Sequence, residues 1–368
     1  MSGTTSVSSA TLIAATIGIG VGTAVQAAVN TKAGAHFGLS LVGPFFTFFI
    51  ALVLLTVAAA IEARVMQIPF LLWSARPQIH HLLPGLIGVA FVAGGVIVSA
   101  QVGAALFWIP LICGQLTASA VLDHFGLSTA GGEKKPIDAF KSGALVLAVV
   151  GAVLSVAERL NAPGKLSPGV ILAYEVAALI IGALTPVQAA LSRAAVARLP
   201  SRLAATWWSF AVGLVSIAIA LGAQAGIESA AAAAFSARFD DSLWWYYTGG
   251  IFGVAYIGTT IFWAPRIGSA RYFVALVSGQ LAGSAAIDAT GALGFAVTPL
   301  GPERGVGIAL VLVAATLLAV GRAAFSPSAV AVSHPIADTE AATNSSVKVG
   351  LLYATNATTS RDVGPQQS

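Results

Sequence analysis

Five amide side chains lie inside long apolar stretches of this sequence, where a polar group is costly to bury. They are Gln26, Asn30, Gln115, Gln188 and Gln280. Burying an amide without hydrogen-bond partners costs about 2–7 kcal/mol, so each must bond to a neighbouring helix or to a bound solute. We predict that all five contact a small-molecule substrate. Hydrogen bonding between helices is the competing interpretation, above all for Gln115 and Gln280.

Gly18, Gly22, Gln26 and Asn30 recur at every fourth position of the first apolar run. On a helix this spacing places them in one stripe along a single face. The two glycines permit a close helix approach, and the two amides then point toward the interior of the bundle.

Three acidic residues complete the predicted site. Glu175 lies about two turns into an apolar run, where an ionisable group is by default a functional hypothesis. Two interpretations stay open for it: a group that exchanges protons as part of the function, or a protonated or snorkelling side chain without such a role. Asp123 and Asp288 each end an apolar run, where a carboxylate opposes the helix dipole. They are predicted to pair with loops or to act as gates, with plain interfacial solvation as the alternative.

The spacing of the residues does not indicate a metal site or a catalytic site. His80, His81, His124 and Cys113 have no metal-ligand spacing, and no nucleophile, base and acid recur as a triad. The net charge of +4 comes from residues scattered between apolar runs, so no basic face for nucleic acid exists. The sequence predicts neither an enzyme nor a cofactor or metal site.

The elements that carry these residues are predicted to be membrane-spanning helices. The chain is 57% hydrophobic and 9% charged, whereas soluble domains carry roughly 25% charged residues. A transmembrane helix needs about 20 mostly apolar residues. Such runs fall near 10–29, 39–61, 82–100, 102–122, 138–157, 168–190, 203–225, 244–263, 268–288 and 305–321.

The third and fourth runs are separated by a turn rather than by a charged loop. Residues 82–122 contain no charged side chain, and as one helix they would extend about 60 Å, twice the hydrocarbon core. The chain must therefore fold back, and residues 99–103 are the predicted turn.

The sequence contains an internal duplication. Residues 20–53 align without gaps on 182–215 with 12 identities, and residues 85–126 align on 250–291 with 14. The matched residues include polar ones, which a shared apolar composition does not explain. Gln26 pairs with Gln188, Gln115 with Gln280, and Asp123 with Asp288.

An odd number of spans per copy requires the second copy to enter the membrane upside down. Cytoplasmic loops collect Lys and Arg, which tests this independently. With a cytoplasmic N-terminus, ten basic residues fall on the inside: Arg64, Arg76, Lys134, Lys135, Arg193, Arg198, Arg202, Arg266, Arg271 and Arg322. Five fall on the outside: Lys32, Arg159, Lys165, Arg238 and Arg304. Both termini are therefore predicted to be cytoplasmic.

Several motifs resemble a known family. They are Gln26-Ala27-Ala28, the segment Gly103 to Phe107, Gly114-Gln115-Leu116 and Asp123-His124-Phe125-Gly126. The chain resembles a fused tandem of two five-span YdcZ-like units, inner-membrane exporters of the drug/metabolite transporter superfamily. The resemblance covers about residues 10–322, and the second copy departs from it where Asn30 becomes Ser192. It implies a small-molecule transporter that works by alternating access, with a cavity between the half-bundles, and it names no substrate.

We therefore predict an all-α polytopic membrane protein of about ten transmembrane helices, arranged as two five-helix repeats of inverted topology. Residues 1–160 form the first repeat, 161–325 the inverted second, and 326–368 a disordered cytoplasmic tail. The predicted function is a secondary transporter, an exporter of a small metabolite or amphipathic compound across the bacterial cytoplasmic membrane. Proton coupling is one hypothesis, and the sequence does not identify the coupling ion. The alternative is a lipid scramblase or a structural scaffold.

Overall fold

The computed structural model describes residues 8–66, 78–127, 134–161, 166–196, 201–227, 241–267, 269–298 and 301–320. The fold of these residues is helical and contains no strand. Ten of the helices correspond to the ten predicted spans. They are α1 (Ser9–Phe37), α2 (Val42–Met66), α3 (Leu83–Val102), α4 (Ala104–Phe125), α5 (Ala139–Asn161), α6 (Pro168–Val196), α7 (Arg202–Ile227), α9 (Gly249–Phe262), α11 (Ser269–Thr290) and α12 (Pro302–Val320).

Short helices join some of these elements. They are the 3-10 helices η1 (Ile79–His81), η3 (Asp241–Tyr247) and η4 (Ala292–Gly294), and the four-residue α10 (Ala264–Ile267). The predicted span 244–263 is therefore only partly α-helical, because its first residues belong to η3. Gly250 follows η3 and lies so close to α2 that an added Cβ would be 2.7 Å from the Ala51 nitrogen. This close approach requires glycine at the start of α9.

Length, composition and exposure identify a polytopic membrane protein. Within the described residues, seven helices are long and apolar enough to cross a bilayer: α1, α2, α3, α4, α6, α7 and α11. Large apolar side chains also face outward, with exposures of 62% for Val146, 53% for Val57 and 70% for Ile219. Extensive apolar surface of this kind suits lipid as the surrounding solvent. The all-α membrane fold is confirmed.

The predicted turn between the third and fourth spans is confirmed as a single residue. Gly103 separates α3 from α4 with φ of +95°, and its N–H donates to the Ser99 carbonyl. A positive φ is strained for residues that carry a Cβ, so glycine is needed there. The consequence is a tight hairpin in which α4 runs back along α3.

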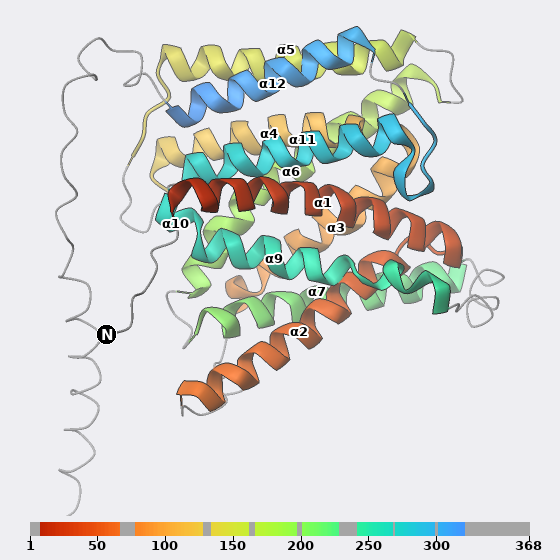
Figure 1. The fold of residues 1–368 in the computed structure, drawn as a ribbon, viewed down its shortest axis with the longest axis vertical. Helices are drawn as coiled ribbons and strands as arrows, with labels where there is room; N and C mark the ends of the chain where they lie inside the picture. The colour runs from red at the N-terminus through yellow and green to blue at the C-terminus, as the bar shows by residue number, and fades with distance from the viewer. Residues whose placement is uncertain are drawn as a thin grey trace, which may run out of the picture. The chain divides into compact units, whose positions relative to one another are not determined.

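The first helix of each sequence copy packs against the fourth helix of the other copy. Thus α1 lies along α11 and α6 lies along α4, while α5 pairs with α12 and α2 with α7 (Figure 1). Exchanging the two copies turns the α1–α11 pair into the α6–α4 pair. The α5–α12 and α2–α7 pairs each map onto themselves. The contacts therefore have pseudo-twofold symmetry, and the two halves interlock rather than forming separate bundles.

Four matched glycines stand where these helices cross. An added Cβ on Gly20 would overlap the Leu276 carbonyl oxygen on α11, and one on Gly182 would overlap the Leu111 carbonyl oxygen on α4. The partner glycines Gly279 and Gly114 are blocked in the same way by α1 and α6. Because Gly20 matches Gly182 and Gly114 matches Gly279, the duplication preserves both crossings.

The direction of the helices shows that the copies are inverted. Gly279 lies against Ile17, and Gly283, one turn later on α11, lies against Val21 and Ala24, about one turn later on α1. The two helices therefore run parallel. The Thr31–Ser99 hydrogen bond lies near the C-terminal ends of α1 and α3, and the Gly103 hairpin turns α4 the opposite way. Helix α4 and its counterpart α11 therefore run in opposite directions. The boundary after residue 160 stays a prediction, and the predicted tail lies outside the described residues.

Candidate functional site

Two of the predicted amides line one cavity where the two halves meet. We call it the central cavity. Gln26 on α1 and Gln188 on α6 both face it, and α2, α3, α7 and α9 complete its wall. The lining residues are Gln26, Thr47, Phe48, Gly88, Phe91, Val92, Gln188, Ser209, Phe210, Gly253, Tyr256 and Ile257.

These twelve residues form six pairs under the repeat alignment. Residues 20–53 shift by 162 positions and residues 85–126 by 165. The shifts pair Gln26 with Gln188, Thr47 with Ser209, Phe48 with Phe210, Gly88 with Gly253, Phe91 with Tyr256, and Val92 with Ile257. Each half contributes the same six positions, with closely similar side chains. The central cavity therefore lies on the pseudo-twofold axis.

Glycines make room for the two amides. The Gln188 Nε2 atom lies 3.1 Å from the position of a Cβ on Gly88, and Gln26 Nε2 lies 3.4 Å from that of a Cβ on Gly253. Gln188 Nε2 also donates a hydrogen bond of 2.9 Å to the Pro84 carbonyl. Each amide thus faces the third helix of the copy to which it does not belong.

Two ring pairs join the halves across the axis. Phe91 and Tyr256 are stacked with ring centroids 6.3 Å apart and planes 15° from parallel. Phe48 and Phe210 lie 5.6 Å apart at 54°. Our sequence reasoning ranked polar residues and did not propose these aromatics as site residues. The repeat alignment carried the signal, since both pairs join matched positions.

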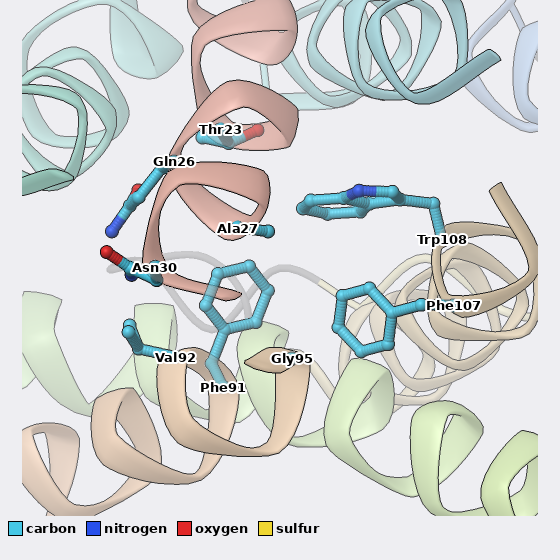
Figure 2. A pocket seen from close by; sticks show the side chains of 9 residues that line it. All are labelled: Thr23, Gln26, Ala27, Asn30, Phe91, Val92, Gly95, Phe107 and Trp108. Carbon is cyan, nitrogen blue, oxygen red and sulfur yellow. The ribbon is translucent and has the colours of Figure 1, made fainter. Parts of the chain in front are cut away.

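A narrow pocket adjoins the central cavity and shares Gln26, Phe91 and Val92 with it (Figure 2). Its other lining residues are Thr23, Ala27, Asn30, Gly95, Phe107 and Trp108. Gln26 and Asn30 lie on the same side of α1, as the predicted stripe requires (Figure 2). Asn30 also holds α2, because its Oδ1 accepts a hydrogen bond of 2.8 Å from Thr47.

Both spaces are small in this conformation. The cavity volume is about 40 Å³ for the central cavity and about 10 Å³ for the adjoining pocket. One water molecule needs roughly 10–15 Å³ on the same measure. The site has room for a few water molecules and must open before it admits a metabolite.

A wider pocket, which we call the vestibule, opens near one end of the helices. Its volume is about 360 Å³, and it is lined by Thr31, Lys32, Ala35, Ser99, Ala100, Gln101, Val102, Gly103, Asp288, Phe295, Ala296, Thr298 and Arg304. Asp288 and Arg304 form an ion pair there at 3.9 Å, and both are more than nine-tenths buried. Lys32 donates to the Gly294 carbonyl and lies 4.5 Å from the Phe295 ring centroid.

Asp288 lines the vestibule, and its predicted role as a gate stays a prediction. Asp123, its counterpart, ends α4 and interacts electrostatically with Arg193 at the end of α6. The two aspartates thus lie on different helices of opposite direction, and each interacts electrostatically with an arginine. Their surroundings differ, since Arg304 belongs to α12 and Arg193 to α6.

Four predicted residues do not line these three pockets: Asp123, described above, and Gln115, Gln280 and Glu175. Gln115 and Gln280 follow the crossing glycines Gly114 and Gly279, are at most 2% exposed, and have side-chain amides without a hydrogen-bond partner within the described residues. Glu175 is also buried, and its carboxylate oxygens have no such partner there. It lies on the same face of α6 as Ile171 and Ala178, which belong to the apolar core formed with α4, α5 and α12. Their predicted roles stay predictions.

The fold and the paired cavity define a polytopic membrane protein built from two inverted copies of one unit. A protein-family model agrees with this duplication. The family described as "Putative inner membrane exporter, YdcZ" matches residues 11–154 and again residues 173–317. The chain belongs to this family, as two fused copies. A search of curated proteins found no matching relative.

Proposed function

We propose that the protein is a secondary transporter that exports a small metabolite or amphipathic compound by alternating access. The central cavity is the proposed substrate site. The observation that carries the proposal is the symmetry of the central cavity. All twelve residues that line it fall into six matched pairs from the inverted copies. Family membership supports the direction, since the family is described as an exporter.

Inverted repeats supply a physical route to alternating access. If the two copies exchange conformations, a cavity on the pseudo-twofold axis that faces one side of the membrane turns toward the other. The substrate contacts are preserved in this exchange, because each half presents the same side chains. A site with such matched walls can have similar affinity in both states, which a carrier needs.

The small central cavity and the larger vestibule fit one intermediate of such a cycle. The Thr31–Ser99 hydrogen bond of 3.1 Å joins α1 to α3, and both residues line the vestibule. Asn30 and Gly95, one residue and one turn away, line the pocket beside the central cavity. In the proposed cycle, separation of α1 from α3 at this bond would connect the vestibule to the cavity.

The remaining parts of the proposal concern coupling and orientation. We include proton coupling through Glu175, supported by a buried carboxylate that would cost several kcal/mol to keep charged without a partner. We also include a bacterial cytoplasmic membrane location with both termini in the cytoplasm, supported by the distribution of Lys and Arg.

The test is transport by purified protein in liposomes. Vesicles loaded with a panel of labelled metabolites and amphipathic dyes should release at least one of them faster than empty liposomes when a proton gradient is imposed. The Gln26→Leu and Gln188→Leu double variant should lose this release, whereas Gln78→Leu, an exposed glutamine beside η1, should retain it. Absence of release across the panel by folded protein would contradict the proposal, and scrambling of labelled lipids would favour a lipid-handling function.

A further inference from the structure

The wall of the central cavity carries no formal charge at neutral pH. Among its twelve residues, only Tyr256 has an ionisable side chain, and phenols are neutral at pH 7. The charged residues Lys32, Asp288 and Arg304 line the vestibule instead. An ion moved into the central cavity would leave its hydration without meeting a counter-charge, at a cost of several kcal/mol. The cavity therefore disfavours ions of either sign.

The aromatic side chains give the cavity flat apolar surfaces. Phe91 and Tyr256 are stacked with nearly parallel rings whose centroids are 6.3 Å apart, toward the wide end of the range for aromatic pairs, about 4.5–7 Å. The rings come from α3 and α9, so each half supplies one of them. A flat solute that enters between them would stack on a ring from each half. A saturated, puckered ring would lack this contact.

The two amides add hydrogen-bonding groups without adding charge. Gln188 uses one N–H for the Pro84 carbonyl, which leaves its second N–H and its carbonyl oxygen for another partner. Gln26 presents the same groups from the other half. An amide pairs well with another amide-like edge, because each then offers one donor and one acceptor.

We propose that the central cavity binds an uncharged, flat solute with an amide-like edge, stacked on Phe91 and Tyr256 and hydrogen-bonded by Gln26 and Gln188. The inference rests on the proposed function only in taking this cavity as the substrate site. It adds the substrate class, which neither the fold nor family membership provides.

Binding measurements with matched probes test the charge requirement. Benzamide, benzoate and benzamidinium have nearly the same shape and are neutral, negative and positive. Equilibrium dialysis of each labelled compound against the full chain in lipid nanodiscs should show saturable binding of benzamide. Benzoate and benzamidinium should bind at least about tenfold more weakly, a difference of roughly 1.4 kcal/mol. Equal or tighter binding of either ion would overturn the proposal.

A second comparison tests the stacking. Cyclohexanecarboxamide keeps the amide but replaces the flat ring with a puckered one, and it should bind at least about tenfold more weakly than benzamide. Phe91→Leu and Tyr256→Leu should remove this preference, while Phe49→Leu, an exposed ring on α2, should keep it. Equal affinity for the two amides in the unmodified protein would overturn the stacking.

A charge-introducing variant tests the location. Gln26→Glu should lower benzamide affinity and raise benzamidinium affinity, so that the order of the two ligands reverses. Gln188→Glu is the matched variant from the other half and should act in the same direction. An unchanged order in both folded variants, or no saturable benzamide binding by the unmodified protein, would overturn the proposal.

The experiments can contradict the ligand proposal and the transporter proposal independently. If benzamide binds as described but release from liposomes is absent for every solute, the transporter proposal fails and the assigned ligand class stands. If a charged solute is released and the Gln26→Leu and Gln188→Leu double variant blocks it, transport stands and the neutral-solute inference fails.

Discussion

The central cavity and the vestibule differ in how far the two copies agree. Every residue of the cavity wall has a similar counterpart in the other half. At the vestibule the alignment pairs Thr31 with Arg193, Lys32 with Ala194, and Gln101 with Arg266. The duplicated sequence has therefore kept one shared site on the axis and has diverged at the two ends.

This difference separates two tasks of the proposed transporter. A cavity with matched walls treats both membrane sides alike, so it can hold a substrate but cannot by itself favour export over import. The ends present different charges, with Thr31 and Lys32 at one end and Arg193 at the other. Unequal ends are where a preferred direction or a different rate of opening can arise. We expect substitutions in the cavity to act alike in both halves and substitutions at the ends to act differently.

Filling the cavity from either half should have the largest effect. Gly88→Val and Gly253→Val each place methyl groups against an amide of the cavity, and each should lower transport about 100-fold, an effect of roughly 2.7 kcal/mol. The measurement is initial release from liposomes, normalised to folded protein. Gly222→Val, at a glycine of α7 with open space around it, should leave release unchanged. A large loss in one half with none in the other would break the symmetry argument.

Replacing the two buried amides outside the described pockets, Gln115 and Gln280, should have the next largest effect. Gln115→Leu together with Gln280→Leu should reduce transport at least about tenfold if these amides reach the substrate in another conformation. Membrane levels should stay normal, because the leucines leave no buried amide unsatisfied. Quantitative blotting and release from liposomes measure the two outcomes. Wild-type release by the double variant would remove both residues from the site.

The two end aspartates should behave differently although they are matched in sequence. Asp288→Asn removes the carboxylate that pairs with the buried Arg304, and breaking a buried pair costs roughly 3–5 kcal/mol. Asp123→Asn removes a less buried carboxylate and should cost about 0–1 kcal/mol. Thermal unfolding in detergent should show a clearly lower midpoint for Asp288→Asn alone. Equal shifts would mean that the ends are as alike as the cavity.

The smallest change in rate is expected at Glu175. If this residue couples export to protons, wild-type release should increase as the external pH falls, because inward proton flow then drives export. Glu175→Gln should lose that dependence and keep a similar rate without a gradient, within about twofold. Release from liposomes across a series of external pH values provides the measurement. A pH profile identical to wild type would exclude Glu175 as the coupling residue.

Sequence reasoning reached most of the fold because membranes impose simple rules. Span length, the uncharged 82–122 segment and the paired polar residues predicted ten helices, the Gly103 turn and the inverted repeat. Only part of the candidate site could be predicted from the sequence. Gln26 and Gln188 were found because buried amides need partners, but Phe91 and Tyr256 look like ordinary apolar residues until their positions in space are known. The 3-10 start of the span at 244–263 was missed because hydropathy does not distinguish types of helix.

The sequence by itself determined that lipid surrounds most of the protein, how many long helices it forms and how its halves are related, since these follow from hydropathy, loop charge and internal identity. Tertiary structure decided which residues meet. It brought the Gln26 and Gln188 positions, 162 residues apart, to one cavity, and it left Gln115, Gln280 and Glu175 outside the described pockets. The physical reason is that helix crossing depends on close packing at a few glycines. A periodic sequence shows which face of a helix is polar, but only the crossings show what that face meets.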